Sequence, residues 1–214
     1  MHVFFDLDGT LTDSCPGIIR CIDHALVELG YPHVAEEHLR GMIGAPLSTI
    51  FETLLRSSEP DLLDRAVAAY RVRFDRTGIF ENCLFPGVVE ALTTLRQAGH
   101  SLQIVTAKPA VAARRVVEHF EIGRFFEAVH GPDLDERLFE KARLLETAVR
   151  GVPAGQSVMV GDRADDVRAA HACGVQAVAA AWGYGAREEL RAANPTYVAE
   201  SMAELVDWVR GLNA

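Results

Sequence analysis

The chain has 214 residues, of which 24% are charged, with a formal net charge of -9 and a pI of about 5.3. This acidic balance argues against nucleic acid and anionic membranes as partners, because both require a basic surface. No run of about 18 apolar residues is present, so we expect no membrane span. The first residues form an apolar run that we expect to be a core strand and not a targeting segment, and the four cysteines form no C-x-x-C pair. We therefore expect a cytoplasmic protein with reduced thiols.

Short apolar runs alternate with amphipathic segments along most of the chain. In chain order, strands are predicted at 2–5, 101–106, 126–131, 157–162 and 175–181. Helices are predicted at 87–99, 109–120, 137–149 and 163–174. Pro109 suits a first helical turn, and Gly174 suits the position just past a last turn. This alternation predicts an α/β fold, a Rossmann-like doubly wound parallel sheet with helices on both faces.

Residues 15–80 interrupt this alternation after the first strand. Their helical patterns lie at 17–30, 47–55 and 61–78, and they contain no convincing strand. Asp13 and Ser14 precede the first of these helices and are predicted to cap it. We therefore predict a catalytic core formed by 1–14 and 81–214, and a small all-helical cap domain formed by 15–80.

Carboxylates follow two of the predicted strands. Asp6 and Asp8 follow the first strand, and Asp162 follows the fourth. Ligands bind at the carboxyl ends of strands in an open parallel sheet, so we expect these side chains to meet there. Grouped carboxylates repel one another unless a cation lies between them, and hard oxygen ligands suit Mg²⁺. The Asp6–Asp8 pair alone could merely cap a turn. The second acidic cluster, "GDRADD", favours a metal site with one carboxylate free as a nucleophile.

Two further strand ends offer groups that could bind a phosphate. Thr106 ends the second strand in "TAKP", where Ala107 and Lys108 lead into a predicted helix N-terminus with free N–H groups. Lys141 lies in the helix after the third strand, and the chain has only these two lysines. We predict that Thr106, Ala107, Lys108 and Lys141 bind the substrate phosphate. The competing interpretations are a capping threonine and solvated surface lysines.

Four features of the chain resemble the motifs of the haloacid dehalogenase-like hydrolases in order and spacing. They are "FFDLDGTLTDS", "IVTAK", Lys141 and "VMVGDRADDVRAAHACGV". The resemblance covers essentially the whole chain, and residues 15–80 resemble the cap domain that this superfamily inserts after its first motif. The tail at 180–205 is similar to the phosphoglycolate phosphatase-like and bacterial 5′-nucleotidase-like branch.

This resemblance implies a role for each matching residue. Asp6 is implied to be the nucleophile, and Asp8 the general acid for the leaving oxygen and then the base for water. The implied metal ligands are Asp6, Asp8 through its backbone carbonyl, and Asp162. Asp166 is implied to orient the metal's waters or a lysine, unless its neighbour Asp165 takes that part.

The implied activity is Mg²⁺-dependent hydrolysis of a small organic phosphate monoester through an aspartyl-phosphate. Phosphoglycolate and nucleoside 5′-monophosphates are the favoured substrates, and the presence of Asp8, which dehalogenating members lack, favours phosphate chemistry. The segment 41–50 of the cap is either a specificity loop or a simple connector. The alternatives are a phosphosugar mutase and a non-catalytic regulatory protein that binds a phosphorylated ligand. The expected partner is a small phosphorylated metabolite, and the expected state is a monomer or a homodimer.

Overall fold

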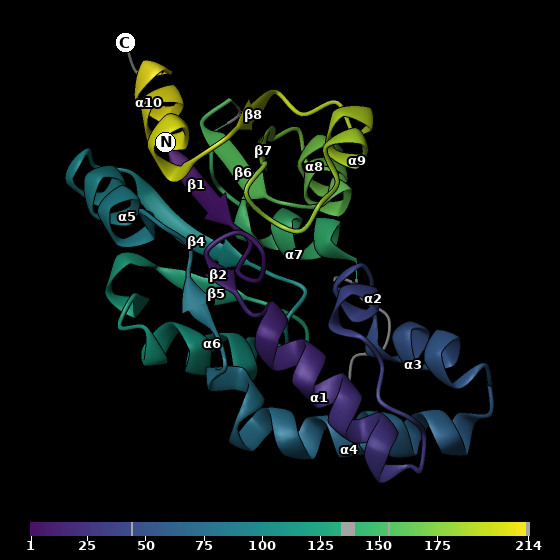
Figure 1. Cartoon of the computed structure of the whole chain (residues 1–214). Coiled ribbons are helices and arrows are strands. Elements are labelled where there is room, and N and C mark those ends of the chain that lie inside the picture. Colours follow the sequence, from purple (N-terminus) through teal and green to yellow (C-terminus); the bar gives the residue numbers. More distant parts are fainter. Residues whose placement is uncertain (44, 134–139, 154, 213–214) are drawn as a thin grey trace. The chain divides into compact units, whose positions relative to one another are not determined.

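The computed structural model of the chain (Figure 1) describes residues 1–43, 45–133, 140–153 and 155–212. The chain divides into two compact units. The core unit comprises Met1–Asp13 and Leu84–Ala214, and the helical unit comprises Ser14–Cys83. Within the described residues, no helix combines the length and the apolar character that a bilayer crossing requires.

The core unit contains a six-stranded sheet in the order β5-β4-β1-β6-β7-β8, and every neighbouring pair of strands is parallel. The strands are β1 (His2–Phe5), β4 (Ser101–Val105), β5 (Ala128–His130), β6 (Ser157–Gly161), β7 (Gln176–Ala180) and β8 (Tyr197–Ala199). The first five confirm the predicted strands and the α/β class. The sixth, β8, is an addition to the predicted set, because its three residues are too short to form a recognisable apolar run.

Six α-helices accompany this sheet in the described part of the core unit. They are α5 (Val88–Gln97), α6 (Ala110–His119), α7 (Lys141–Ala148), α8 (Ala164–Ala172), α9 (Arg187–Ala192) and α10 (Met202–Gly211). The first four confirm the predicted helices, except that 137–139 of the predicted third helix lie outside the described residues. As predicted, Gly174 follows the end of α8, with a φ of 66°.

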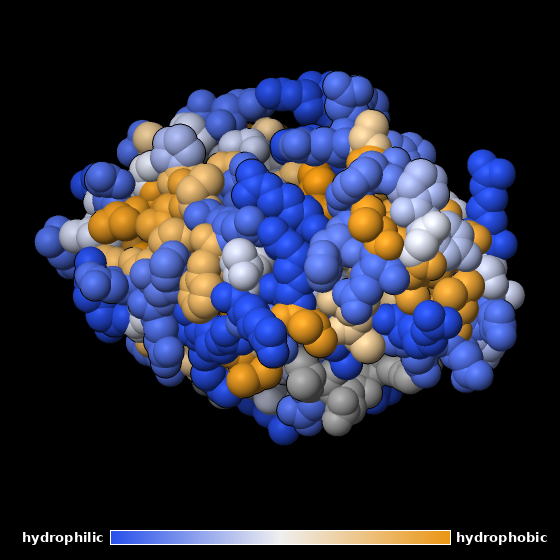
Figure 2. Space-filling model, turned by 60° about the horizontal axis from the view of Figure 1, so that its bottom comes forward, coloured by the Kyte–Doolittle hydropathy of each residue, from blue (hydrophilic) through white to orange (hydrophobic). Residues whose placement is uncertain are grey.

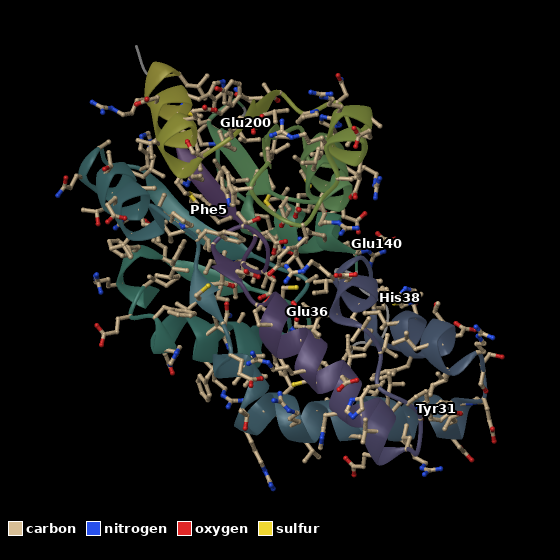
Figure 3. All side chains as sticks on the ribbon, in the orientation of Figure 1. Phe5, Tyr31, Glu36, His38, Glu140 and Glu200 are labelled. Carbon is tan, nitrogen blue, oxygen red and sulfur yellow. The ribbon has the colours of Figure 1, made fainter. Side chains whose placement is uncertain are left out.

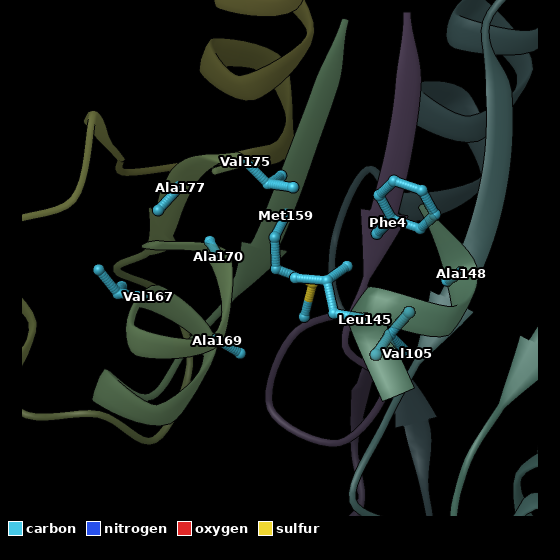
Figure 4. Packing of buried hydrophobic residues seen from close by; sticks show 10 residues of the cluster. All are labelled: Phe4, Val105, Leu145, Ala148, Met159, Val167, Ala169, Ala170, Val175 and Ala177. Atoms are coloured by element: carbon cyan, nitrogen blue, oxygen red, sulfur yellow. The ribbon is translucent and has the colours of Figure 1, made fainter. Parts of the chain in front are cut away.

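The centre of the sheet is buried on both faces. Val3, Phe4 and Phe5 of β1 are fully buried, as expected for a parallel strand covered by helices on both sides. On one face, Phe4 packs with Met159 of β6 and Leu145 of α7 in a cluster that α8 completes (Figure 4). The core therefore fixes the position at which β1 ends.

Strand register brings the carboxyl ends of three strands together. Phe5 pairs with Ile104 of β4 on one side and with Val160 of β6 on the other. The N–H of Asp6 continues this pairing by donating a 2.8 Å hydrogen bond to the Val160 carbonyl. Asp6 thus leaves the sheet between the ends of β4 and β6.

The helical unit contains four α-helices among its described residues. They are α1 (Cys15–Glu28), α2 (Glu36–Arg40), α3 (Leu47–Leu55) and α4 (Pro60–Arg76), followed by a 3₁₀ turn at Gly78–Phe80. Short strands lie where the chain leaves and re-enters the core unit, β2 (Thr12–Asp13) and β3 (Cys83–Leu84). Inside the unit, Phe51 contacts Tyr70 edge-on, with ring centroids 6.5 Å apart. The helical patterns predicted for 15–80 are thus confirmed as helices.

One face of the molecule is shown by hydropathy in Figure 2. Hydrophilic side chains cover much of this face, and hydrophobic patches are dispersed among them. Such dispersed apolar side chains are normal for the surface of a water-exposed protein.

Candidate active site

Lys141 joins two acidic side chains at the carboxyl end of the sheet. It is the first residue of α7, and its Nζ lies 2.8 Å from Asp6 Oδ2 and 2.5 Å from Asp166 Oδ1. Phe5 and Glu140, labelled in Figure 3, mark the positions directly before Asp6 and Lys141 in the chain. The Lys141 side chain is only 8% exposed, so the ammonium is held inside the protein by its two carboxylate partners.

Three buried carboxylates form a cluster around this lysine. Asp6, Asp162 and Asp166 each offer an oxygen, and these oxygens lie within 4.8 Å of one another. Three carboxylates carry three negative charges, and Lys141 offsets one of them. A divalent cation would neutralise the remaining two, and an all-oxygen donor set is the kind that Mg²⁺ prefers. The cluster therefore fits the predicted metal in both charge and donor type.

Burial and the repulsion between neighbouring carboxylates raise the pKa of two aspartates in the cluster. Burial, then the neighbouring Asp166 and Asp6, raise the pKa of Asp162 to about 7. Burial also raises the pKa of Asp166, although Lys141 acts in the opposite direction. For Lys141, burial would lower the pKa, but Asp166 and Asp6 together raise it well above its ordinary value. The lysine is therefore charged, and it forms ion pairs with Asp6 and Asp166 of the cluster.

The carboxylate of Asp162 is held by two hydrogen bonds and by the close approach of two glycines. Thr10 Oγ1 donates a 3.0 Å hydrogen bond to its Oδ1, and the Tyr184 N–H donates a 2.8 Å hydrogen bond to its Oδ2. Gly9 has a φ of 84°, and a Cβ there would overlap the Asp162 carboxylate. Gly183 approaches the same side chain equally closely. Only glycine can occupy position 9, because both the backbone conformation and the lack of space exclude a side chain.

The loop after β7 supports the residues around Asp162, and this role was not predicted from the sequence. Trp182 Nε1 donates a 2.9 Å hydrogen bond to the Thr10 carbonyl, and the Tyr184 hydroxyl donates one of 2.9 Å to Asp13 Oδ1. The available signal was "WGYG" directly after a predicted strand, where two glycines permit close approach to a neighbouring loop. The predicted cap of α1 by Ser14 is wrong. Ser14 occupies the N-cap position, but within the described residues its side chain makes no capping hydrogen bond.

The structure separates the two neighbouring aspartates at the start of α8. Asp165 is exposed and pairs with Arg168 at 2.5 Å on the helix surface. Asp166 is 1% exposed, and in addition to Lys141 it accepts a 2.9 Å hydrogen bond from the Arg163 N–H. Asp166 is therefore the one of the two that contacts Lys141, and it also belongs to the carboxylate cluster.

The "TAKP" segment after β4 makes hydrogen bonds of its own, and the predicted phosphate contacts of Thr106, Ala107 and Lys108 stay predictions. Thr106 is buried, and its Oγ1 accepts a 3.2 Å hydrogen bond from the Lys108 N–H, while Ala107 is exposed. Lys108 Nζ lies 2.5 Å from Asp8 Oδ2. Asp8 thus directs its side chain to Lys108, and it is not among the three carboxylates of the cluster. The predicted specificity loop 41–50 includes residue 44, which lies outside the described residues, so its role stays a prediction.

Comparison with known proteins relates the chain to one family. A family model described as haloacid dehalogenase-like hydrolase matches residues 3–180. A 5′-nucleotidase of Pseudomonas aeruginosa is 37% identical over 206 residues, which cover 95% of this chain and 93% of the relative. A phosphoglycolate phosphatase of Vibrio parahaemolyticus is 33% identical over 97% of this chain and 95% of its own length.

A solved structure extends this similarity to the three-dimensional fold. The structure of protein tyrosine kinase A (PtkA) from Mycobacterium tuberculosis superposes with a TM-score of 0.82 at 33% identity. The match covers 97% of this chain and 96% of that chain. The same fold and a related sequence thus occur in proteins named for removing phosphate and in one named for transferring it.

Proposed function

We propose that this chain, which belongs to the haloacid dehalogenase-like hydrolase family and is a phosphatase, hydrolyses a small organic phosphate monoester with Asp6 as the nucleophile and Mg²⁺ as the cofactor. The observation that carries the proposal is the position of the Asp6 side chain. Its carboxylate is buried beside Asp162 and Asp166, and the Lys141 ammonium lies 2.8 Å from it. A buried carboxylate held by a buried cation is fixed in place to attack an electrophile.

The metal would be held by the oxygens of Asp6 and Asp162 and by the backbone carbonyl of Asp8. When bound, Mg²⁺ would screen the charge of the phosphate from that of the carboxylates. Lys141 supplies a second cation, which can bind a phosphoryl oxygen while Asp166 holds it in position. The buried hydroxyl of Thr106 is a further donor to the phosphoryl group.

Two steps complete the reaction. First, the Asp6 carboxylate attacks phosphorus, the bond from phosphorus to the leaving oxygen breaks, and the carboxylic acid of Asp8 gives its proton to that oxygen. The products are the free alcohol and an aspartyl-phosphate on Asp6. Water then attacks phosphorus, Asp8 takes a proton from it, and Asp6 and inorganic phosphate are released. Asp8 ends protonated, as it began, so atoms and charge balance over the cycle.

The relatives guide the choice of substrate. One is named a 5′-nucleotidase and another a phosphoglycolate phosphatase. We therefore propose a nucleoside 5′-monophosphate or phosphoglycolate as the substrate. A fold alone does not define a substrate, so this part of the proposal depends on the two names.

Similarity to PtkA favours a second candidate function. In that case the phosphoryl group on Asp6 would pass to a tyrosine hydroxyl in place of water, with the same nucleophile and the same proton transfers. We favour water as the acceptor, because the 5′-nucleotidase and the phosphoglycolate phosphatase are matched over 93% and 95% of their own length, whereas PtkA is matched over 67% of its own length.

The experiment is a steady-state screen of phosphate esters with Mg²⁺, applied to the wild type and to Asp6→Asn. We expect Asp6→Asn to lose at least about 10³-fold in kcat and to form no phosphoenzyme. Asp207→Asn, which alters an exposed carboxylate on α10, serves as the matched control and should keep full activity. Wild-type turnover by Asp6→Asn would overturn the proposal. Phosphate transfer to a tyrosine peptide without release of inorganic phosphate would favour the second candidate.

A further inference from the structure

Lys108 has no role in the steps above, although its ammonium is bonded to Asp8. We infer that Lys108 is a positioning residue, which fixes the orientation of the Asp8 carboxyl so that one oxygen carries the transferable proton. The inference depends on the proposed role of Asp8 in protonating the leaving oxygen. It assigns Lys108 a role beside the predicted contact with the substrate phosphate, which stays a prediction.

The first support is the contact itself. Lys108 Nζ lies 2.5 Å from Asp8 Oδ2, and the lysine side chain is 6% exposed whereas that of Asp8 is 22% exposed. A hydrogen bond from an ammonium that is largely shielded from water is weakened by the solvent much less than one on the surface. Lys108 can therefore restrict the carboxyl strongly, while Asp8 stays open enough to exchange a proton with a bound molecule.

The second support is the rigid placement of Lys108. Its N–H donates a 3.2 Å hydrogen bond to Thr106 Oγ1, and a Cβ on Gly131 would overlap its carbonyl oxygen. Ala110, two residues on, donates a 3.0 Å hydrogen bond to the Pro132 carbonyl. The backbone around Lys108 is thus held by Thr106 before it and by the loop after β5 behind it, which fixes the point from which its side chain extends.

The third support is the chemistry of the two Asp8 oxygens. Oδ2 accepts a hydrogen bond from the ammonium, so a proton on Oδ2 would face another donor. The proton of the carboxylic acid is therefore placed on Oδ1. The described side-chain contact of Oδ1 is Thr12 Oγ1 at 3.5 Å, the outer limit for a hydrogen bond. Oδ1 is thus the oxygen that can donate to a leaving group.

Each of the two lysines of the chain contacts one of the two aspartates that are proposed to act in the reaction. Lys141 lies against Asp6, the nucleophile, and Lys108 lies against Asp8, the proton donor. Loss of Lys141 should impair every substrate, because every substrate needs the nucleophile. Loss of Lys108 should impair substrates in proportion to their need for a proton on the leaving oxygen, because general acid catalysis contributes most to poor leaving groups.

The test compares kcat/KM for two phosphate esters. p-Nitrophenyl phosphate releases a stabilised phenolate that needs no proton, whereas phosphoglycolate releases an alkoxide that does. We expect Lys108→Met to lose about 10- to 100-fold more kcat/KM on phosphoglycolate than on p-nitrophenyl phosphate. Lys108→Arg should recover part of the difference, because the cation returns with altered geometry.

Two controls keep the inference falsifiable. Arg168→Met removes the cation from an exposed ion pair of the same 2.5 Å length and should change neither ester. Asp8→Asn should show the largest difference between the two esters in the loss of kcat/KM. Equal losses on both esters for Lys108→Met and Lys108→Arg, with matched unfolding midpoints, would overturn the role of Lys108 alone. Absence of selectivity in Asp8→Asn would overturn the proposed role of Asp8 as well.

Discussion

The backbone N–H of Tyr184 donates a 2.8 Å hydrogen bond to Asp162 Oδ2, which ties the loop after β7 to a carboxyl of the cluster whose pKa is raised to about 7. The same residue reaches Asp13 through its hydroxyl, at 2.9 Å. Asp13 is the residue at which the chain leaves the core unit. One residue therefore supports both a proposed metal ligand and the strand β2, at which the chain leaves the core unit.

Replacement of Gly9 by alanine should damage the carboxylate cluster specifically. At φ 84° a Cβ costs on the order of 1–2 kcal/mol, and here it would also overlap Asp162. Gly30→Ala is a matched control, because Gly30 has the same φ of 84° and nothing lies within 4 Å of the place that its Cβ would take. Urea unfolding should show a larger loss for Gly9→Ala, and Mg²⁺ titration should show weakened binding in that variant alone. Equal losses of unfolding free energy in both variants would contradict the prediction, because the Cβ at position 9 would then be accommodated beside Asp162 at no extra cost.

Removal of the Thr10 hydroxyl should weaken metal binding without unfolding the protein. Thr10→Val keeps the side-chain shape but removes the 3.0 Å hydrogen bond to Asp162 Oδ1. Loss of a group that orients a metal ligand typically costs about 10- to 100-fold in metal affinity. Isothermal titration with Mg²⁺ measures this, and Thr53→Val, which removes an exposed hydroxyl bonded to the Thr49 carbonyl, is the control. Unchanged affinity in Thr10→Val would argue that Asp162 is positioned by the backbone alone.

The metal-free protein should lose stability as the pH rises from about 4 to about 7. The pKa of Asp162 is raised to about 7, so over this range the folded state keeps a proton that the unfolded chain has released. The unfolded state therefore binds fewer protons, and the free energy of unfolding falls with pH, by on the order of 2–4 kcal/mol from this group. Asp162→Asn should flatten the curve measured by urea unfolding in the presence of a chelator. A wild-type curve no steeper than that of the variant would contradict the prediction.

Stabilisation by Mg²⁺ should be larger at about pH 8 than at about pH 5, because at the lower pH the ion must displace the proton on Asp162. The shift in melting temperature on addition of Mg²⁺ measures this at each pH. Asp207→Asn should behave as the wild type, and Asp162→Asn should lose most of the shift at both pH values. A larger shift at the lower pH would show that Asp162 is not a ligand.

The sequence is sufficient to predict the frame of the core unit. β1 is predictable because Val3, Phe4 and Phe5 are buried on both faces, and a strand of that kind must be continuously apolar. The polar residues at its end are equally visible, since nothing but a functional role or a turn explains two aspartates there. β8 and α9 have only three and six residues, which is too short for a periodic pattern to stand out.

The contacts around the site could not be predicted from local sequence. Thr10 and Asp162 are 152 positions apart, and Lys108 and Asp8 are 100 apart, so no spacing rule connects them. The choice between Asp165 and Asp166 depends on which side of α8 faces Lys141, and adjacent residues in a helix point in different directions. The motif "TAKP" places Lys108 at a strand end, but it does not identify the partner of its ammonium.

The distribution of lysine gives the protein a built-in spectroscopic reporter. Both lysines of the chain bond to aspartates of the site, and no other residue carries an ε-ammonium group. Protein labelled with ¹⁵N only at the lysine side chains should therefore give two ammonium signals, one from beside Asp6 and one from beside Asp8. Each stage of turnover could then be followed separately at the nucleophile and at the proton donor, with no background from the surface.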